Sequence, residues 1–387
     1  MLIDLAEPQF WAVLAAALVL LTPIVNGELR RWVLALVNAS FLVLLLRSWT
    51  LVILASVLVA QEIGQRIHRR KGAGKSMLLG AARLVVIGLF VYHKCPALSD
   101  AFPLAPLGLV LAAVGFSYVA LRLIDFMRTM SEKRAKPPGF AALLNYLFPF
   151  HMLAAGPIQS FTEFAAQPAT PNPIAFEDAL QGIGRIAQGL FKKYVLAYCL
   201  IQLTSTAWQA RGAYALLEMN FHYFWLYLDF SGYSDIAVGV GILIGVATPE
   251  NFNRPYLARN MTDFWQRWHI SLSQFVRRNI FMPIQLALIR GNHNPIVTAS
   301  LALGVSFLIV GLWHGVTLPW FLWGMMHASG VILSNLYREF LKRKLSAEGL
   351  ERYNASLPIR LVSTFVTTEF VALSLVLVGN QWHSAWN

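Results

Sequence analysis

Apolar residues dominate the chain in long runs that short polar segments separate. Runs of spanning length occur near residues 10–26, 32–47, 49–65, 77–93 and 104–127. Further apolar runs lie near 183–205, 213–230 and 234–247, and further spans near 295–313, 317–337 and 359–379. A helix needs about 20 mainly apolar residues to cross the hydrocarbon core of a bilayer. The pattern therefore predicts an all-α polytopic membrane protein with about ten or eleven spans.

Two further features of the pattern predict how the chain is organised. Residues 137–175 contain seven prolines, and because proline disfavours helix interiors, we expect interfacial helices and loops there. No polar segment is long enough to form a separate water-soluble domain. We therefore expect one integral membrane domain over 1–387, with peripheral spans over 1–114, a motif-bearing core over 115–337, and a cytoplasmic loop and last span over 338–387.

Composition supports the membrane assignment. The chain is 57% hydrophobic and 13% charged, which is more apolar than a soluble domain. Its net charge of +12 comes from basic residues clustered in alternate loops, at 30–31, 66–75, 128–136 and 338–352. Basic loops face the cytoplasm, so we expect the N-terminus outside. The clusters fit anionic lipids or an acidic cytosolic partner rather than nucleic acid. The two cysteines form no metal or disulfide pattern.

One hydrophobic stretch, residues 260–283, carries many charged groups. Asn260 suits the N-cap of a helix with Asp263 in its first turn, and Pro283 should end that helix. At helical spacing, one face carries Trp265, His269, Leu272 and Val276, and another carries Arg267, Ser271 and Arg278. Because charge at membrane depth is costly, we expect a re-entrant or interfacial helix that is buried in protein or lines a wet cavity. An amphipathic helix on the membrane surface, with an ordinary interfacial histidine, fits equally well.

Polar residues also lie inside several other apolar runs. Arg122 and Asp125 are three positions apart on one helix face and can form a buried ion pair, for which a structural role is expected. His151 stands shortly before a Gly-Pro turn, where packing is the expected role.

The segment LDFSGYSD at 228–235 carries two carboxylates. Asp229 and Asp235 are six positions apart, so they share a helix face only if the helix breaks at Gly232. Such a break would turn Ser231, Tyr233 and Ser234 inward. For Asp235 we expect structural hydrogen bonding.

His314 has a different setting from the other histidines in apolar runs. It lies in GLWHG near the end of a run, and glycines let other groups approach closely. A broken helix there would expose the imidazole to a cavity. Because an unperturbed histidine has a pKa of about 6.5, it can take a proton from a hydroxyl near neutral pH. The setting fits general-base catalysis within a membrane and fits a proton-coupled transporter equally well.

A series of motifs runs from residue 115 to about residue 327. It comprises GFSYVALRLID (115–125), AGPIQS (155–160), DFSGYSDIAVGVGILIG (229–245), PENFNRPYLARNMTDFWQRWHISLSQFVRRNIFMP (249–283) and GLWHG (311–315). This series resembles the membrane-bound O-acyltransferase (MBOAT) family, in the bacterial branch of teichoic-acid D-alanyl transferases and alginate-type O-acetyltransferases. The segment after Pro283 departs from the Gly-Gly-Asn-like turn of the alginate-type members, and NIFMP favours the D-alanyl branch, although that branch commonly has another residue at Pro283.

The resemblance implies a cone-like helical fold around a transmembrane tunnel. An acyl thioester would enter from the cytoplasm and a hydroxyl acceptor from outside. His314 matches the family's essential histidine, and His269 matches a second motif position that is Asn, Asp or His among members. In the D-alanyl branch the donor is a phosphopantetheinyl carrier protein, and in the polysaccharide branch a periplasmic partner often takes the acyl group.

We therefore expect an O-acyltransferase of the bacterial cytoplasmic membrane. It would move a D-alanyl or acetyl group from a thioester of an acyl carrier protein or coenzyme A to a hydroxyl of a cell-envelope polymer or extracellular polysaccharide. His314 would act as general base, supported by His269, with no bound cofactor or metal and with a periplasmic or small membrane protein as a further partner. The alternatives are a proton-coupled transporter or flippase and a scaffold for an envelope complex.

Individual side chains have expected roles in this reaction. The residues expected to line the tunnel are Trp265, Trp268, Arg267, Ser271, Trp313, Asp229, Ser231 and Tyr233. The residues expected to dock an acidic carrier are Arg277, Arg278 and Arg290.

Overall fold

The computed structural model describes residues 5–102, 104–153, 155–168, 174–204, 213–291 and 294–379. Within these ranges the chain is helical, and the pairing of extended segments is limited to an isolated bridge between Phe252 and Trp268. The chain divides into two compact units, residues 1–191 with 232–249 and residues 192–231 with 250–387. The single membrane domain stays a prediction. Pro171, Pro173 and the end of the run at 183–205 lie outside the described residues.

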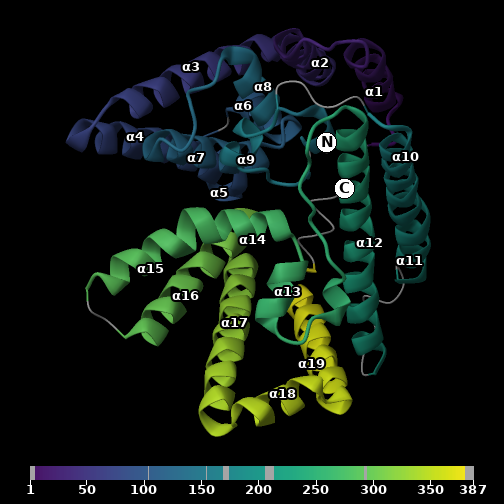
Figure 1. The fold of residues 1–387 in the computed structure, drawn as a ribbon, viewed down its shortest axis with the longest axis vertical. Coiled ribbons are helices and arrows are strands. Elements are labelled where there is room, and N and C mark those ends of the chain that lie inside the picture. The colour runs from purple at the N-terminus through teal and green to yellow at the C-terminus, as the bar shows by residue number, and fades with distance from the viewer. Residues whose placement is uncertain are drawn as a thin grey trace. The chain divides into compact units, whose positions relative to one another are not determined.

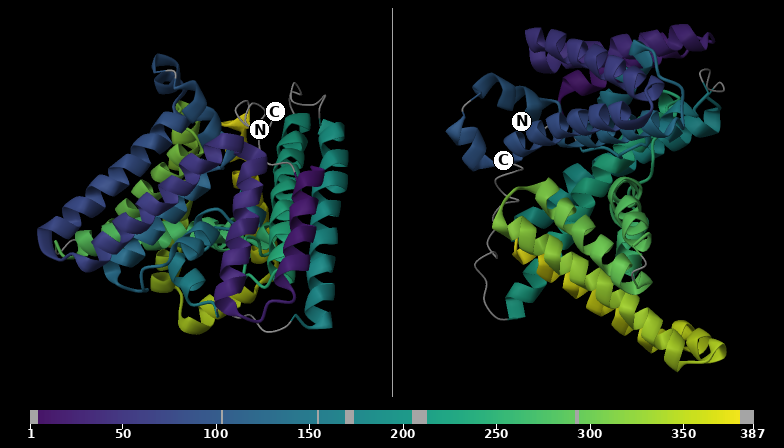
Figure 2. Two further views of the ribbon diagram at one scale, coloured as in Figure 1. Left: turned by 90° about the horizontal axis from the view of Figure 1, so that it is seen from above. Right: turned by 90° about the vertical axis from the view of Figure 1, so that its left-hand side faces the viewer.

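The first unit consists of α1–α10 and the C-terminal part of α12 (Figure 1). Its helices are α1 (Pro8–Leu21), α2 (Gly27–Leu46), α3 (Thr50–Arg69), α4 (Gly72–Lys94), α5 (Pro96–Ala101), α6 (Ala105–Ala113), α7 (Phe116–Glu132), α8 (Phe140–Leu147), α9 (Phe161–Ala165), α10 (Phe176–Leu190) and part of α12 (Ala213–Leu243). Helices α3, α4 and α7 pack side by side (Figure 1 and Figure 2). Asn26 caps α2 by accepting hydrogen bonds from the N–H groups of Glu28 and Leu29.

The second unit carries the stretch at 260–283 and the GLWHG motif. Its helices are α11 (Ala197–Thr204), the N-terminal part of α12, α13 (Met261–Arg267), α14 (Ile270–Val276), α15 (Met282–Ile289), α16 (Pro295–His314), α17 (Leu318–Lys344), α18 (Ala347–Ala355) and α19 (Leu357–Val376). Helices α16 and α17 lie against each other (Figure 1). Glycine allows this close approach, because a Cβ atom on Gly311 would lie 2.3 Å from the carbonyl oxygen of Trp320.

The number of membrane spans differs from the sequence prediction. In the described part of the chain, four helical segments are long and apolar enough to cross a membrane: 27–69, 72–94, 295–314 and 357–376. The first of them contains α2 and α3, which a short 3-10 turn joins. A fifth is counted if Leu107–Ala113 and Phe116–Glu132, which meet at 79°, form one bent span. The prediction of ten or eleven spans is not confirmed. Several apolar runs form helices that are shorter or less apolar than a spanning segment.

The proline-rich segment forms short helices and loops, as its sequence predicts. Arg122 on α7 is fully buried and holds this segment by donating hydrogen bonds to the carbonyl oxygens of Leu147 and Met152, both at 3.1 Å. Asp125 accepts a hydrogen bond of 2.8 Å from the N–H of Phe161. The expected Arg122–Asp125 ion pair is therefore corrected, since each side chain binds backbone groups of the proline-rich segment instead. His151 is buried and lies 3.2 Å from the hydroxyl of Thr248.

Helix α12 is continuous through Gly232, so the helix break considered there is wrong. Gly232 is instead a point of close packing, because a Cβ atom on Gly189 of α10 would lie 2.5 Å from the Gly232 carbonyl oxygen. The two carboxylates have basic partners that the sequence analysis missed. Asp229 forms an ion pair with Lys193, and Asp235 forms one of 2.7 Å with Arg185.

Candidate functional site

The stretch at 260–283 is not one helix. Its start is as predicted, because the side-chain oxygen of Asn260 accepts a hydrogen bond of 2.9 Å from the N–H of Asp263. Helix α13 then ends at Arg267, and His269 has a left-handed backbone (φ 44°, ψ 53°) before α14 starts. The prediction of two continuous helical faces is therefore wrong, since Trp265 lies on α13 and His269 lies in the turn after that helix ends.

The end of the stretch also differs from the prediction. Residues Arg277–Phe281 form a π-helical turn that leads directly into α15. Pro283 lies in the first turn of α15 and does not end a helix, because the first turn needs no backbone donor from proline. Short π-helical segments are frequent at functional sites.

A strand-like strap at residues 251–253 holds the turn between α13 and α14. The N–H of Asn253 donates to the Arg267 carbonyl at 2.9 Å, and the N–H of Ile270 donates to the Asn251 carbonyl at 3.0 Å. The side-chain oxygen of Asn251 accepts hydrogen bonds from the Ser271 hydroxyl at 2.6 Å and from its N–H at 3.3 Å. Asn251 was not singled out from the sequence, although PENFNRP belongs to the motif series.

His269 is buried at this turn, and its ring is oriented by the same amide. Its Nδ1 lies 3.3 Å from the Asn251 side-chain oxygen, which only accepts hydrogen bonds. Nδ1 therefore carries a proton, and Nε2 of the neutral ring is an acceptor. Burial lowers the pKa of His269 to about 3, so the ring is neutral at pH 7. This geometry makes His269 a poor hydrogen-bond donor to a thioester carbonyl.

His314 is the last residue of α16, and the chain becomes extended at Gly315. Three indoles surround the imidazole, with ring centroids at 4.7 Å for Trp320, 4.8 Å for Trp313 and 5.4 Å for Trp323. Trp320 is stacked on the imidazole, and Gly315 makes room for it, since a Cβ atom there would lie 2.5 Å from Cδ1 of Trp320. The helix end predicted at GLWHG is present.

Trp313 connects the two histidines. Its ring centroid lies 4.8 Å from that of His314 and 6.4 Å from that of His269. Two members of this aromatic group, Trp320 and Trp323, were not singled out from the sequence. The signal available for them was the aromatic segment PWFLW that follows GLWHG.

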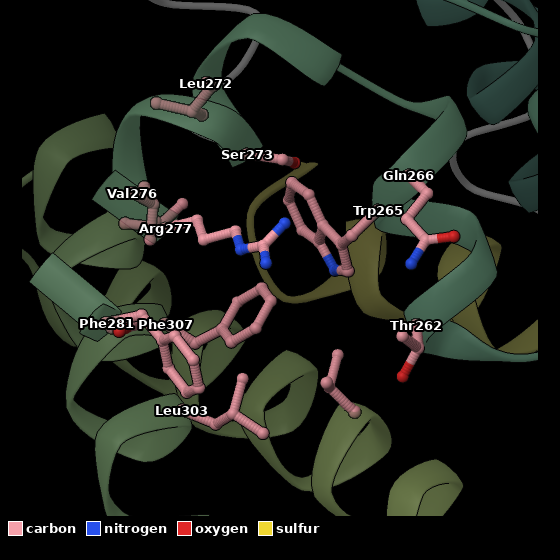
Figure 3. A pocket seen from close by; sticks show the side chains of 13 residues that line it. Thr262, Trp265, Gln266, Leu272, Ser273, Val276, Arg277, Phe281, Leu303 and Phe307 are labelled. Atoms are coloured by element: carbon pink, nitrogen blue, oxygen red, sulfur yellow. The ribbon is translucent and has the colours of Figure 1, made fainter. Parts of the chain in front are cut away.

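A partly open cavity of about 200 Å³ lies among α13, α14, the π-helical turn, α16 and α17 (Figure 3). Most of its lining is apolar, and its residues are Thr262, Trp265, Gln266, Leu272, Ser273, Val276, Arg277, Phe281, Leu303, Ser306, Phe307, Val310 and Val331. The guanidinium of Arg277 extends toward the indole of Trp265 (Figure 3). The ring centroids of Trp265 and Trp323 are 6.1 Å apart, and the Trp323 ring also contacts His314. The cavity wall is thus two ring contacts from His314.

The other predicted tunnel residues lie in several environments. Trp268 packs against the rings of Phe252, Tyr223 and Phe264 at 5.0–5.7 Å. Arg267 forms an ion pair of 2.6 Å with Asp263. Ser231 is buried, and its hydroxyl has no hydrogen-bond partner among the described residues. Tyr233 belongs to the first unit.

The three arginines expected to bind a carrier differ in exposure. Arg277 and Arg290 are exposed, whereas Arg278 is half-buried. Where the structure describes the chain, no group of three or more His, Cys, Asp or Glu side chains could hold a metal ion.

Comparison with known proteins identifies the family. The model of the membrane-bound O-acyltransferase family matches residues 35–376. The chain is 27% identical over 288 residues to the teichoic acid D-alanyltransferase of Streptococcus thermophilus, covering 70% of this chain and 69% of that protein. It is 29% identical over 293 residues to the probable alginate O-acetylase AlgI of Pseudomonas syringae pv. tomato, covering 70% and 53%. It is 30% identical over 233 residues to the peptidoglycan O-acetyltransferase of Helicobacter pylori, covering 59% and 41%. The chain therefore belongs to the membrane-bound O-acyltransferase family.

Proposed function

We propose that this multi-pass membrane O-acyltransferase moves a D-alanyl or acetyl group from a cytoplasmic thioester across the bacterial cytoplasmic membrane to a hydroxyl of a cell-envelope polymer. The names of the relatives, which include a teichoic acid D-alanyltransferase and a peptidoglycan O-acetyltransferase, support this class of acceptor. The observation that carries the proposal is the setting of His314 at a helix end among three tryptophans.

In this proposal His314 is the general base. Its imidazole takes the proton of the acceptor hydroxyl as the oxygen attacks the thioester carbonyl carbon. The carbon–sulfur bond then breaks, and the leaving thiolate takes that proton from the imidazolium. Enclosure among indoles holds the ring in place and excludes water, so the reacting groups meet in a fixed orientation.

The negative charge on the thioester carbonyl oxygen needs a hydrogen-bond donor. His269 is less suited to this than the sequence indicated, because its Nδ1 proton is directed to Asn251. Trp323 fits better. Its ring contacts His314, and its buried Nε1–H has no hydrogen-bond partner among the described residues. We assign the donor role to Trp323, and His269 supports the site through Trp313.

The cavity beside Arg277 is the proposed place for the donor's arm. A phosphopantetheine arm has an apolar part, amides and a phosphate, and the cavity offers an apolar wall, buried donors at Trp265 Nε1 and Ser273 Oγ, and a cation. Both donors lack a partner in the part of the chain that the structure describes. In this proposal the thiol end of the arm lies toward Trp323 and His314.

The function is tested with the purified full chain in proteoliposomes. With a D-alanyl or acetyl thioester of an acyl carrier protein outside and a glycerol-phosphate polymer inside, we expect one ester formed for each thioester consumed. The measurement follows both products by mass spectrometry, and protein-free vesicles are the control. Movement of a solute or lipid across the vesicle wall with the thioester left intact would instead support the transporter alternative.

Docking of an acidic carrier is expected to depend on the charges of Arg277, which lines the cavity, and of Arg290, at the end of α15. The double substitution Arg277→Glu with Arg290→Glu should lower kcat/KM for the carrier-linked donor about tenfold at low salt, because repulsion replaces attraction at two exposed positions. The loss should shrink as salt screens the charges. Arg338→Glu, an exposed position on α17, is the matched control. Equal kcat/KM for the double variant and wild type at every salt concentration would contradict carrier docking here.

A further inference from the structure

One arginine in the first unit, Arg83, has a buried nitrogen whose hydrogen bonding is incomplete within the described ranges. Arg83 lies on α4, the candidate span with the smallest buried share, since 6% of its apolar 18-residue window is buried. Its neighbours Leu84 and Val85 are 70% and 63% exposed. In the described part of the chain the Arg83 Nε has no hydrogen-bond partner although that atom is buried. A charge on an apolar helix face is costly unless it is paired or reaches the interface.

The groups around Arg83 carry more positive than negative charge. Its guanidinium interacts electrostatically with Arg128 and Glu132 of α7. The Glu132 carboxylate is already shared, because it forms ion pairs of 2.7 Å with Arg128 and with Arg134. A lysine, Lys75 of α4, donates to the carbonyl of Ser131 nearby. Four of these groups are basic, and one is a carboxylate.

This excess charge calls for an anion from outside the chain. Arg128 also has a buried guanidinium nitrogen, Nη1, without a hydrogen-bond partner among the described residues. The long stem of Arg83 can lie along α4 while its head reaches toward the end of α7, where charged groups gather. At the edge of a bilayer, the anion available to such a head is a lipid phosphate.

We propose that Arg83 and Arg128, together with Lys75 and Arg134, bind the headgroup of an anionic glycerophospholipid between α4 and α7. The exposed apolar side chains of α4, which include Met77 and Leu84, hold its acyl chains. Guanidinium groups form strong, charge-assisted hydrogen bonds with phosphate. The net positive surroundings select a headgroup with net negative charge over a zwitterionic one. This lipid site lies on the first unit, whereas both histidines belong to the second, and it takes no part in the proposed reaction.

The site is tested by binding short-chain lipids to the full chain in a neutral detergent. Dioctanoyl phosphatidylglycerol should raise the midpoint of thermal unfolding saturably. Dioctanoyl phosphatidylcholine and inorganic phosphate should not raise it at equal concentration. Native mass spectrometry should show phosphatidylglycerol retained on the wild-type protein in preference to phosphatidylcholine. Equal stabilisation or equal retention of the two lipids would overturn the proposal, and so would saturable stabilisation by phosphate alone.

Two matched substitutions locate the site. Arg83→Gln should weaken phosphatidylglycerol binding about fivefold or more, since one basic residue near an anionic headgroup contributes about that factor. Arg66→Gln removes the same charge from an exposed arginine that is paired with Glu62 at 2.6 Å, and it should weaken binding less than twofold. Equal weakening by both substitutions would show diffuse attraction and overturn the site. If Arg83→Gln does not fold, Arg128→Gln takes its place with the same expected loss.

Discussion

His314→Ala is expected to lower the rate of acyl transfer by about 10²–10⁴-fold, the usual worth of a positioned base, while the protein still folds and inserts. The fold should survive because apolar packing along the helices dominates stability, and His314 is a half-buried side chain at a helix end. The measurement is transfer from a thioester donor by purified, monodisperse wild-type and variant protein. Near-normal transfer by folded His314→Ala would leave a structural role for this histidine.

The matched control is the other histidine of the site. His269→Ala should lose less activity than His314→Ala, or should weaken donor binding rather than turnover. His269→Asn should be milder than His269→Ala, because an amide can still donate a hydrogen bond to the Asn251 side-chain oxygen. A loss at His269→Ala as large as that at His314→Ala, with unchanged donor binding, would exchange the two assigned roles.

The positions of two helix ends were predicted from the sequence. The Asn260 cap and the end of α16 at Gly315 each depend on one or two neighbouring residues, and the structure contains both. The break after Arg267 was not readable in the same way. It is imposed by the strap at residues 251–253, in which Asn253 binds the Arg267 carbonyl before His269 and Asn251 binds the N–H groups of Ile270 and Ser271 after it. Helical periodicity within residues 260–283 alone cannot predict hydrogen bonds to this earlier segment.

The partners of buried charges were misjudged for a related reason. Spacing along a helix suggested Arg122 for Asp125, but each found backbone groups from the proline-rich segment. A glycine at 232 suggested a break, but a neighbouring helix fills the space beside it. In both cases contacts between segments that are distant in sequence determined the structure, and helical spacing or the presence of a glycine could not predict those contacts. The roles of His314 and of the tunnel residues remain predictions that the experiments above address.

Trp323→Phe is expected to lower kcat by about 10²-fold or more, the usual effect of removing one donor to a developing oxyanion. Trp323 is buried on α17, and its ring centroid lies 5.4 Å from that of His314. Its Nε1–H lacks a hydrogen-bond partner among the described residues, and a buried donor without a partner is uncommon enough to need a reason. Phenylalanine keeps an aromatic ring at this position and removes the donor.

Trp265→Phe is the matched control for this prediction. It deletes the same indole N–H, which is also buried and without a partner in the described ranges, and it leaves a cavity of similar size. Trp265 lines the cavity beside Arg277, so its loss should raise KM for the donor and leave kcat nearly unchanged. Steady-state kinetics of both variants, with thermal unfolding to compare their stabilities, separate the two effects. Equal losses of kcat in the two variants would assign both indoles to packing and leave the oxyanion donor to another group.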